Sequence, residues 1–113
     1  MCYSTEYFVT PAGRSPVEEF IGSLDAQARE KYVFTKRLLQ KNGPRLGYPY
    51  CKYVRDNIYE LRFKGKSGVV RVLYFFIYYR RIVLAHGFIK KTQKIQKKEI
   101  ELALKRKKLF LEE

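Results

Sequence analysis

The sequence is poor in residues that build disulfide frameworks, metal centres and membrane spans. It has two cysteines and one histidine among 113 residues, and Cys2 and Cys51 show no CxxC or Cys/His metal spacing. We therefore expect both thiols to be reduced and no metal or other cofactor to be bound. The longest apolar run, residues 69–79, is interrupted by Arg71 and is shorter than the ~20 residues that a membrane-spanning helix needs. Since no signal peptide is recognisable, the expected location is the cytoplasm.

Acidic residues are also scarce. Lysine and arginine number 24 against 11 acidic residues, a formal net charge of +13, and so basic a chain is a natural partner for polyanions. From residue 45 to residue 98 there are 14 lysines and arginines against only Asp56 and Glu60, whereas residues 1–44 are nearly balanced at six against five. The sequence therefore places the polyanion-binding surface in its middle and C-terminal half. Two acids there do not support a two-metal nuclease.

The first third of the chain predicts a helical hairpin. Ser15 can cap a helix that has Pro16 in its first turn, and Glu18 can complete a capping box. Asp25 predicts a second N-cap, which opens a longer helix to about Lys41, where Asn-Gly-Pro follows. A short strand at residues 7–10 could precede the hairpin.

The rest of the chain predicts strands and then a last helix. β-branched and aromatic residues favour strands at 58–64, 69–78 and 82–89, with Tyr74, Phe75 and Phe76 as core residues. From about Gln96 the helical period returns, with an apolar stripe of Ile100, Ala103, Leu104 and Leu111. The basic turn at 105–108 could bind RNA or complement the helix dipole. The 46% apolar content fits one domain spanning residues 1–113.

The first strand pair predicts a cluster of positive charge. A symmetric hairpin centred on Lys66-Ser67 makes Arg62 and Arg71 direct cross-strand neighbours. Like charges in such positions destabilise a sheet unless solvent or an anion relieves them, and a phosphate would suit that position. The alternative partner is a salt bridge with Glu60 or Asp56. Alternation along the strand puts the charged set outward and the aromatic set against the helices.

The only histidine lies in the last predicted strand, directly after an apolar run, and precedes several lysines. If the second hairpin turns on Tyr79-Arg80 or Arg80-Arg81, His86 shares the face of Arg71, whereas a slip of one residue puts it on the other face. RNA cleavage without a metal needs a proton acceptor, a proton donor and stabilisation of a charged phosphorane-like state. Histidine suits the proton steps and arginine suits the phosphate. A structural hydrogen-bonding role is the alternative for His86.

Six segments together give the chain a family resemblance. They are Ser15-Pro-Val-Glu-Glu-Phe20, Gly43-Pro-Arg-Leu-Gly-Tyr-Pro49, Tyr59-Glu-Leu-Arg62, Arg71-Val-Leu-Tyr-Phe75, His86-Gly-Phe-Ile-Lys-Lys-Thr-Gln-Lys94 and Lys97-Lys-Glu-Ile100. In this order they resemble the toxins of the RelE/ParE superfamily, in particular the phage-related HigB-like branch of type II toxin–antitoxin systems. The resemblance implies a small α/β (α+β) RelE-like fold. In it an N-terminal helical hairpin packs on a mostly antiparallel sheet of three to five strands, and a C-terminal helix follows.

The resemblance also implies a function. Such toxins are usually metal-independent endoribonucleases that cut mRNA in the ribosomal A site, and a neutralising antitoxin, typically a helix-turn-helix protein, is encoded next door. By this resemblance Arg62 and Arg71 bind phosphate and stabilise the transition state, and His86 and Lys90 are further catalytic candidates. The expected RNA-binding residues are Lys64, Lys66, Lys91, Lys94, Lys97 and Lys98.

Two departures from the family pattern leave the proton-transfer residues open. RelE-type enzymes use a C-terminal tyrosine and some HigB enzymes end in an acid–aromatic–histidine cluster, whereas this sequence ends Phe110-Leu-Glu-Glu113. The superfamily also contains ParE, which keeps the fold and poisons DNA gyrase without cleaving RNA. A gyrase inhibitor and a non-catalytic RNA-binding module are therefore the alternative functions.

Overall fold

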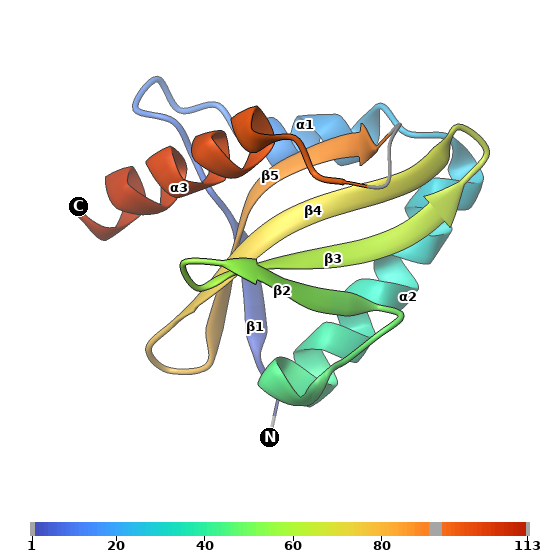
Figure 1. The fold of residues 1–113 in the computed structure, drawn as a ribbon, viewed down its shortest axis with the longest axis horizontal. Helices are drawn as coiled ribbons and strands as arrows, with labels where there is room; N and C mark the ends of the chain where they lie inside the picture. The colour runs from blue at the N-terminus through green and yellow to red at the C-terminus, as the bar shows by residue number, and fades with distance from the viewer. Residues whose placement is uncertain (1, 91–93, 113) are drawn as a thin grey trace.

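The computed structural model describes residues 2–90 and 94–112, and it has the predicted α+β architecture (Figure 1). The elements are, in chain order, β1 (Ser4–Tyr7), α1 (Pro16–Gly22), α2 (Ala26–Asn42), a 3-10 turn (Gly43–Arg45), β2 (Cys51–Arg55), β3 (Ile58–Gly65), β4 (Gly68–Ile77), β5 (Arg81–Lys90) and α3 (Lys97–Leu111). The strand order is β1-β5-β4-β3-β2, with β1 parallel to β5 and the other pairs antiparallel. Helices α1 and α2 cover one face of the sheet and α3 lies on the other.

The helical hairpin forms as predicted, except for its first cap. The carboxylate of Asp25 accepts a hydrogen bond of 2.9 Å from the backbone N–H of Ala28, which caps α2. Ser15 occupies the N-cap position of α1, but its side chain makes no capping hydrogen bond, and its buried hydroxyl has no partner among the described residues. The predicted capping bond at Ser15 is therefore wrong, although the helix begins where it was expected.

The three central strands lie within a residue or two of their predicted bounds, whereas the two edge strands were misjudged. β1 begins and ends three residues earlier than the predicted strand at 7–10. β2 was missed, because its side chains alternate poorly between buried and exposed and a register shift between Tyr53 and Arg55 interrupts it. Leu111, expected on the buried stripe of the last helix, is 53% exposed.

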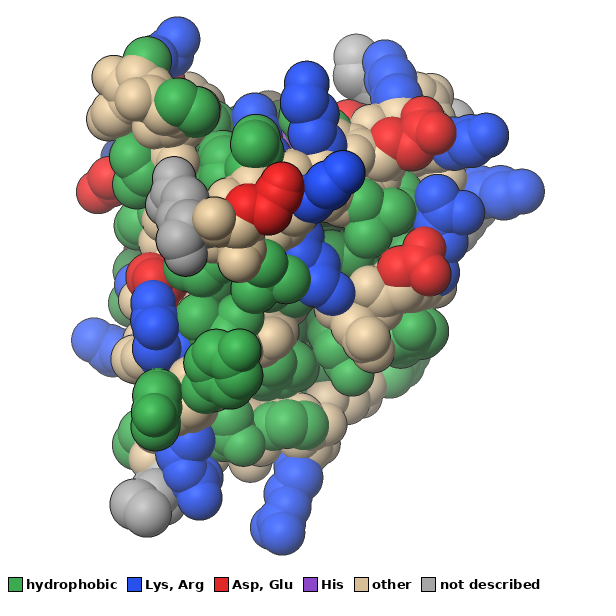
Figure 2. Space-filling view, turned by 90° about the vertical axis from the view of Figure 1, so that its left-hand side faces the viewer, with side chains coloured by type: hydrophobic (Ala, Val, Ile, Leu, Met, Phe, Trp, Pro, Cys, Tyr) green, Lys and Arg blue, Asp and Glu red, His purple; other side chains and the backbone are tan. Residues whose placement is uncertain are grey.

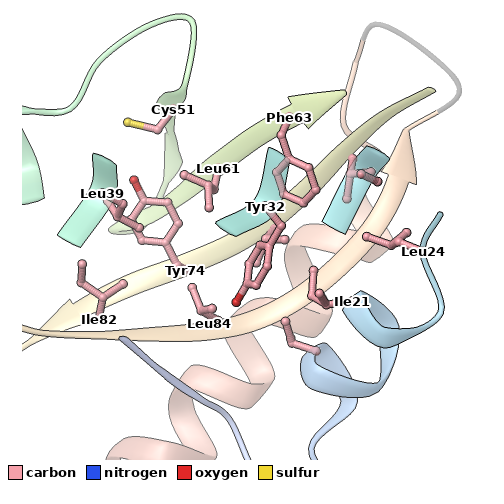
Figure 3. Packing of buried hydrophobic residues seen from close by; sticks show 14 residues of the cluster. Ile21, Leu24, Tyr32, Leu39, Cys51, Leu61, Phe63, Tyr74, Ile82 and Leu84 are labelled. Atoms are coloured by element: carbon pink, nitrogen blue, oxygen red, sulfur yellow. The ribbon is translucent and has the colours of Figure 1, made fainter. Parts of the chain in front are cut away.

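Two apolar clusters fill the layers on either side of the sheet. Figure 3 shows the cluster beneath α1 and α2, where Tyr32 from α2 and Tyr74 from β4 point into the same layer. The second cluster lies under α3 and is built from Phe8, Ile58, Leu73, Phe75, Val83, Ala85 and Ala103. Tyr74 and Phe75 are buried as predicted, and Phe76 packs partly buried against the first cluster.

A β-bulge decides which face His86 occupies. The second hairpin pairs Ile77 with Arg81, so its turn is centred on Tyr79. It is neither of the two turns, on Tyr79-Arg80 or Arg80-Arg81, for which the sequence placed His86 on the face of Arg71. In the register set by the turn on Tyr79, His86 would pair with Val72 and point toward α1 and α2. A register shift at Ala85 adds one residue to β5, after which His86 pairs with Leu73 and shares the face of α3.

No helix in the described residues is long and apolar enough to span a membrane.

Candidate functional site

The predicted site residues gather on the α3 side of the sheet, across the middle of β3, β4 and β5. Arg62 on β3 pairs with Arg71 on β4, as the sequence predicted, and Arg71 pairs with Phe88 on β5. In the neighbouring row Leu73 separates Glu60 from His86. Since cross-strand partners point to the same face, these two rows bring both arginines, one carboxylate and the histidine to one surface.

The two arginines share a single buried carboxylate. Arg71 Nη1 donates a hydrogen bond of 3.0 Å to Glu60 Oε1, and Arg62 Nε lies 3.7 Å from the same oxygen. The salt bridge that the sequence left as the alternative is therefore present, with Glu60, while Asp56 lies beside Arg55 instead. We call Glu60, Arg62 and Arg71 the arginine cluster.

Burial distinguishes the members of the arginine cluster. The prediction that the charged residues of β3 and β4 face outward is wrong for Glu60, which is fully buried, and for Arg71, which is 6% exposed. Their face of the sheet is covered by the second apolar cluster and α3 rather than by water. The Arg62 side chain keeps 21% of its surface exposed, so Arg62 is the member that a ligand reaches first.

The cluster carries more positive than negative charge. One carboxylate between two guanidinium groups leaves one positive charge uncompensated, which is costly in a buried setting. Among the described residues, Glu60 Oε2, Arg62 Nε and Arg71 Nε are buried without a hydrogen-bond partner; the 3.7 Å approach of Arg62 is too long to count as one. Buried donors are normally satisfied, so two unpaired arginine donors suit an anionic oxygen.

Tyr48 contacts Arg62, the partly exposed arginine of the cluster. The Arg62 guanidinium carbon lies 5.2 Å from the centre of the Tyr48 ring, and Tyr48 is 76% exposed. A cation–π contact of this kind limits the directions in which the guanidinium can point. Sequence reasoning did not assign Tyr48 to the site, although it lies in the Gly43–Pro49 segment that supports the family resemblance.

His86 is held by α3 and by an aromatic neighbour. Its Nε2 lies 2.9 Å from Glu99 Oε1, and its ring stacks on Phe88 with centroids 5.3 Å apart. Burial lowers the pKa of His86, and Arg106 acts in the same direction, while the hydrogen bond and charge of Glu99 oppose them. The imidazole is therefore neutral at pH 7. If Nε2 donates its proton to Glu99, Nδ1 is the basic nitrogen.

The histidine and the arginine cluster are close enough to act on one group. Leu73 lies opposite His86, so Arg71 and His86 are diagonal neighbours, for which Cα separations are about 7–8 Å. A neutral imidazole on the strand next to Arg71 could take up a proton while the arginines hold a phosphate. The bond to Glu99 also gives His86 the structural hydrogen-bonding role that the sequence left as the alternative. Its position is therefore compatible with both proton transfer and a structural role.

The predicted lysines are only partly placed. Lys64 lies one row beyond Arg62 on the same face of β3, and Lys66 is in the following turn; both are exposed. Lys90 is the last residue of β5, with its backbone opposite Val69, but its side chain and all of Lys91 are outside the described residues. The other predicted lysines, Lys94, Lys97 and Lys98, are exposed around the start of α3.

The basic turn of α3 serves the fold in part. Arg106 donates a hydrogen bond of 2.8 Å to the carbonyl oxygen of Ala85 and lies over the Phe8 ring. Lys107 donates to the carbonyl oxygen of Asp56 and lies over the Phe75 ring. Lys105 and Lys108 are exposed. Lysine and arginine side chains project around the face shown in Figure 2, with hydrophobic side chains exposed between them.

Comparison with known proteins identifies a family. Residues 19–108 match the model described as Phage derived protein Gp49-like (DUF891), a match that takes in β2 to β5 and most of α3. No curated protein matches the chain. The family is known as one of RelE-like toxins, which agrees with the predicted resemblance at that level, while the HigB-like branch stays a prediction. Since the match extends over most of the sequence, the chain belongs to the Phage derived protein Gp49-like family.

Proposed function

We propose that this protein is a metal-independent endoribonuclease that cleaves mRNA, as the toxin of a type II toxin–antitoxin system. The observation that supports this most strongly is the arginine cluster, in which two guanidinium groups share one carboxylate beside a neutral histidine. We further propose that cleavage requires the ribosome, as in the RelE-like toxins that the family resembles.

In the proposed reaction the nucleophile is the ribose 2′-hydroxyl next to the phosphate that is cut. His86 Nδ1 accepts the proton of the ribose 2′-hydroxyl, and the 2′-oxygen forms a bond to phosphorus. As the bond from phosphorus to the 5′-oxygen breaks, a 2′,3′-cyclic phosphate remains and the leaving oxygen takes up a proton. Lys90, at the end of β5, is the proposed proton donor.

The arginines stabilise the charge that develops on phosphorus in this reaction. Arg62 is the exposed member that meets the substrate, and Arg71 is aligned by Glu60. Preorganised donors of this kind typically contribute ~2.7–4 kcal/mol each in the transition state. Glu60 touches no reacting atom and is a positioning residue.

Primer extension on cellular mRNA after brief induction of the protein tests the proposal. Transcripts with and without a start codon are compared. Cuts confined to translated frames are the expected result, and cuts in both classes would mean a ribonuclease that acts without the ribosome. Growth arrest with intact mRNA and DNA damage signalling would favour the gyrase-inhibitor alternative. Salt-sensitive RNA binding without any cut would leave an RNA-binding module.

Variants connect the result to the arginine cluster. Arg62→Ala is the main variant, because Arg62 is partly exposed and its loss leaves the buried Arg71–Glu60 pair intact. We expect cleavage to fall by ~10²–10³-fold, as for the loss of one transition-state donor. Arg14→Ala is the control. Arg14 precedes α1, is exposed and pairs with Glu19 of that helix. Equal cleavage by both variants would remove Arg62 from the mechanism.

We also propose that an adjacently encoded antitoxin, a helix-turn-helix protein, neutralises this activity. The family membership supports a partner of this kind. Co-expression of the neighbouring gene should restore growth, and the two proteins should co-purify. If growth stays arrested with the neighbour present, the antitoxin must be sought elsewhere.

A further inference from the structure

A cationic pocket lies at one end of the sheet, away from the arginine cluster. Its volume is about 440 Å³, and its lining comes from the N-terminal segment, the C-terminal end of α2, the 3-10 turn and the turn between β4 and β5. The lining residues are Tyr3, Lys41, Asn42, Pro44, Arg45 and Arg80. None of these described lining residues is acidic, and three of them are cationic.

The positive charge of this pocket exceeds what the helix end explains. Lys41 and Arg45 lie near the C-terminus of α2, where cations complement the helix dipole. Arg80 comes from a different element, the turn that connects β4 to β5. Within the described part of the chain, none of the three cations forms an ion pair. The pocket therefore collects uncompensated charge from two separate segments of the chain.

The pocket is also built to hold Arg80 in one orientation. The Arg80 guanidinium carbon lies 5.4 Å from the centre of the Tyr3 ring, and that ring meets Phe76 edge-on at 5.9 Å. The backbone of Tyr3 donates a hydrogen bond of 2.7 Å to the carbonyl oxygen of Gln40. Gly43 is required beside it, because a Cβ there would collide with the Tyr3 ring. Stacking fixes the plane of the guanidinium and leaves its N–H edge for a ligand.

We propose that this pocket binds a backbone phosphate of RNA, from a segment separate from the one at the arginine cluster. A planar guanidinium supported by two further cations suits phosphate oxygens. Exposed tyrosines adjoin Arg80, with Tyr78 79% and Tyr79 89% exposed, and such side chains can stack on bases. RNA is favoured over a protein partner because its charge repeats along the strand and its bases can use the tyrosines.

The geometry separates the two phosphate sites. Tyr3 and Phe76 pack against the apolar cluster beneath α1 and α2, whereas the arginine cluster lies on the α3 side. From Arg71 to Ile77 the strand advances six residues, about 20 Å at ~3.3 Å per residue. One phosphate cannot occupy both sites, so the pocket adds an anchoring contact that is independent of the bond to be cut.

Two binding measurements test the proposal without any cleavage. The first is an NMR titration with inorganic phosphate, followed through the backbone amides of Gly43, Arg45, Leu46 and Arg80. The second is fluorescence anisotropy with a 2′-O-methyl RNA, which cannot be cut because its 2′-oxygen is blocked. The test variant is Arg45→Gln/Arg80→Gln. The control, Arg14→Gln/Lys31→Gln, removes the same charge from exposed positions outside the pocket.

The expected result is a loss specific to the pocket variant. Loss of the one phosphate contact that the pocket makes on a single strand should lower the slope of log K against log salt by ~0.7. Arg80→Lys, which keeps the charge and loses the planar stack, should give an intermediate affinity. Phosphate shifts at the arginine cluster alone, or equal RNA affinity in test and control variants, would overturn the proposal. Neither result bears on cleavage, which the Arg62→Ala experiment measures separately.

Discussion

At the scale of single residues, Glu60 is the side chain on which the site depends most. It is fully buried and accepts a hydrogen bond from the Arg71 guanidinium. Without Glu60, two guanidinium groups on adjacent strands would repel each other. With it, the local charge falls to one positive unit and Arg71 gains a fixed direction. The carboxylate therefore makes the like-charged strand pair tolerable while leaving room for an anion.

A double-mutant cycle tests this role of Glu60. Glu60→Leu alone should lower the free energy of unfolding by ~3–5 kcal/mol, because it leaves Arg71 buried without its counter-ion. Glu60→Leu/Arg71→Met should recover most of that loss, since apolar side chains of similar volume often replace a buried pair at little cost. The cycle is measured by urea denaturation of the wild type, Glu60→Leu, Arg71→Met and the double variant. Additive losses in the double variant would contradict the pairing.

His86 should make stability depend on pH. Since burial lowers its pKa below the ordinary value of about 6.5, the unfolded chain binds its proton more readily than the folded chain. The free energy of unfolding should therefore be undiminished above about pH 6.5 and should decrease as the pH falls toward the lower folded pKa, by at most ~1.4 kcal/mol per pH unit.

The measurement is urea unfolding of the wild type and of His86→Gln at pH 7.5 and pH 5.5. His86 is the only histidine in the chain, so the variant should lose less stability than the wild type over this interval. An equal loss in both proteins would show that carboxylates, rather than the imidazole, control this pH range.

At the scale of the elements, sequence reasoning identified whatever depends on local pattern. It placed both N-terminal helices, the three central strands and the pairing of Arg62 with Arg71, because alternation and turn residues determine these. It missed β2, whose irregular pattern gains meaning only beside β3. It also missed Glu99 as the partner of His86, because that contact arises only when α3 folds across the sheet.

The β-bulge shows why the face of His86 could not be fixed from the sequence. The hairpin turn is centred on Tyr79, a register that places His86 opposite Val72, and the extra residue at Ala85 reverses this. Nothing in the composition around Ala85 marks a bulge. The sequence placed His86 on the face of Arg71 only for turns that the hairpin does not adopt. The bulge brings His86 to that face instead.

The two helix starts provide a matched pair for mutation. Asp25→Ala should lower the free energy of unfolding by ~0.5–2 kcal/mol through loss of the cap on α2, and the bond from Lys66 N to the same carboxylate adds to this. Ser15→Ala should change the free energy of unfolding by less than Asp25→Ala does, because the Ser15 hydroxyl makes no capping bond. Thermal unfolding of the two variants compares them. A larger loss at Ser15 than at Asp25 would contradict this account of the caps.

At the scale of the whole molecule, net charge opposes compactness. A formal charge of +13 is held within a radius of gyration of 13.1 Å, smaller than the Debye length of ~30 Å at 0.01 M salt. At low salt every charge therefore acts on every other. Self-repulsion of this kind destabilises the folded state.

Added salt should consequently stabilise the protein. Raising sodium chloride from 0.01 M to 1 M shortens the Debye length to ~3 Å, which screens repulsion between distant lysines and affects the buried Arg71–Glu60 pair much less. The urea midpoint should rise across this range. A falling midpoint would mean that exposed ion pairs such as Arg14–Glu19 outweigh the general repulsion.

Because β1 pairs with β5, the first strand to be synthesised must wait for the last one before it can pair. Residues 4–7 find their partners only at residues 81–84, and Glu99, which holds His86, is added later still. A nascent chain therefore leaves β1 unpaired until residues 81–84 are added and His86 without its partner until residue 99 is added. If the proposed activity against translating ribosomes is correct, the delay protects the ribosome that makes the protein, because the site is assembled only after residue 99 has been added.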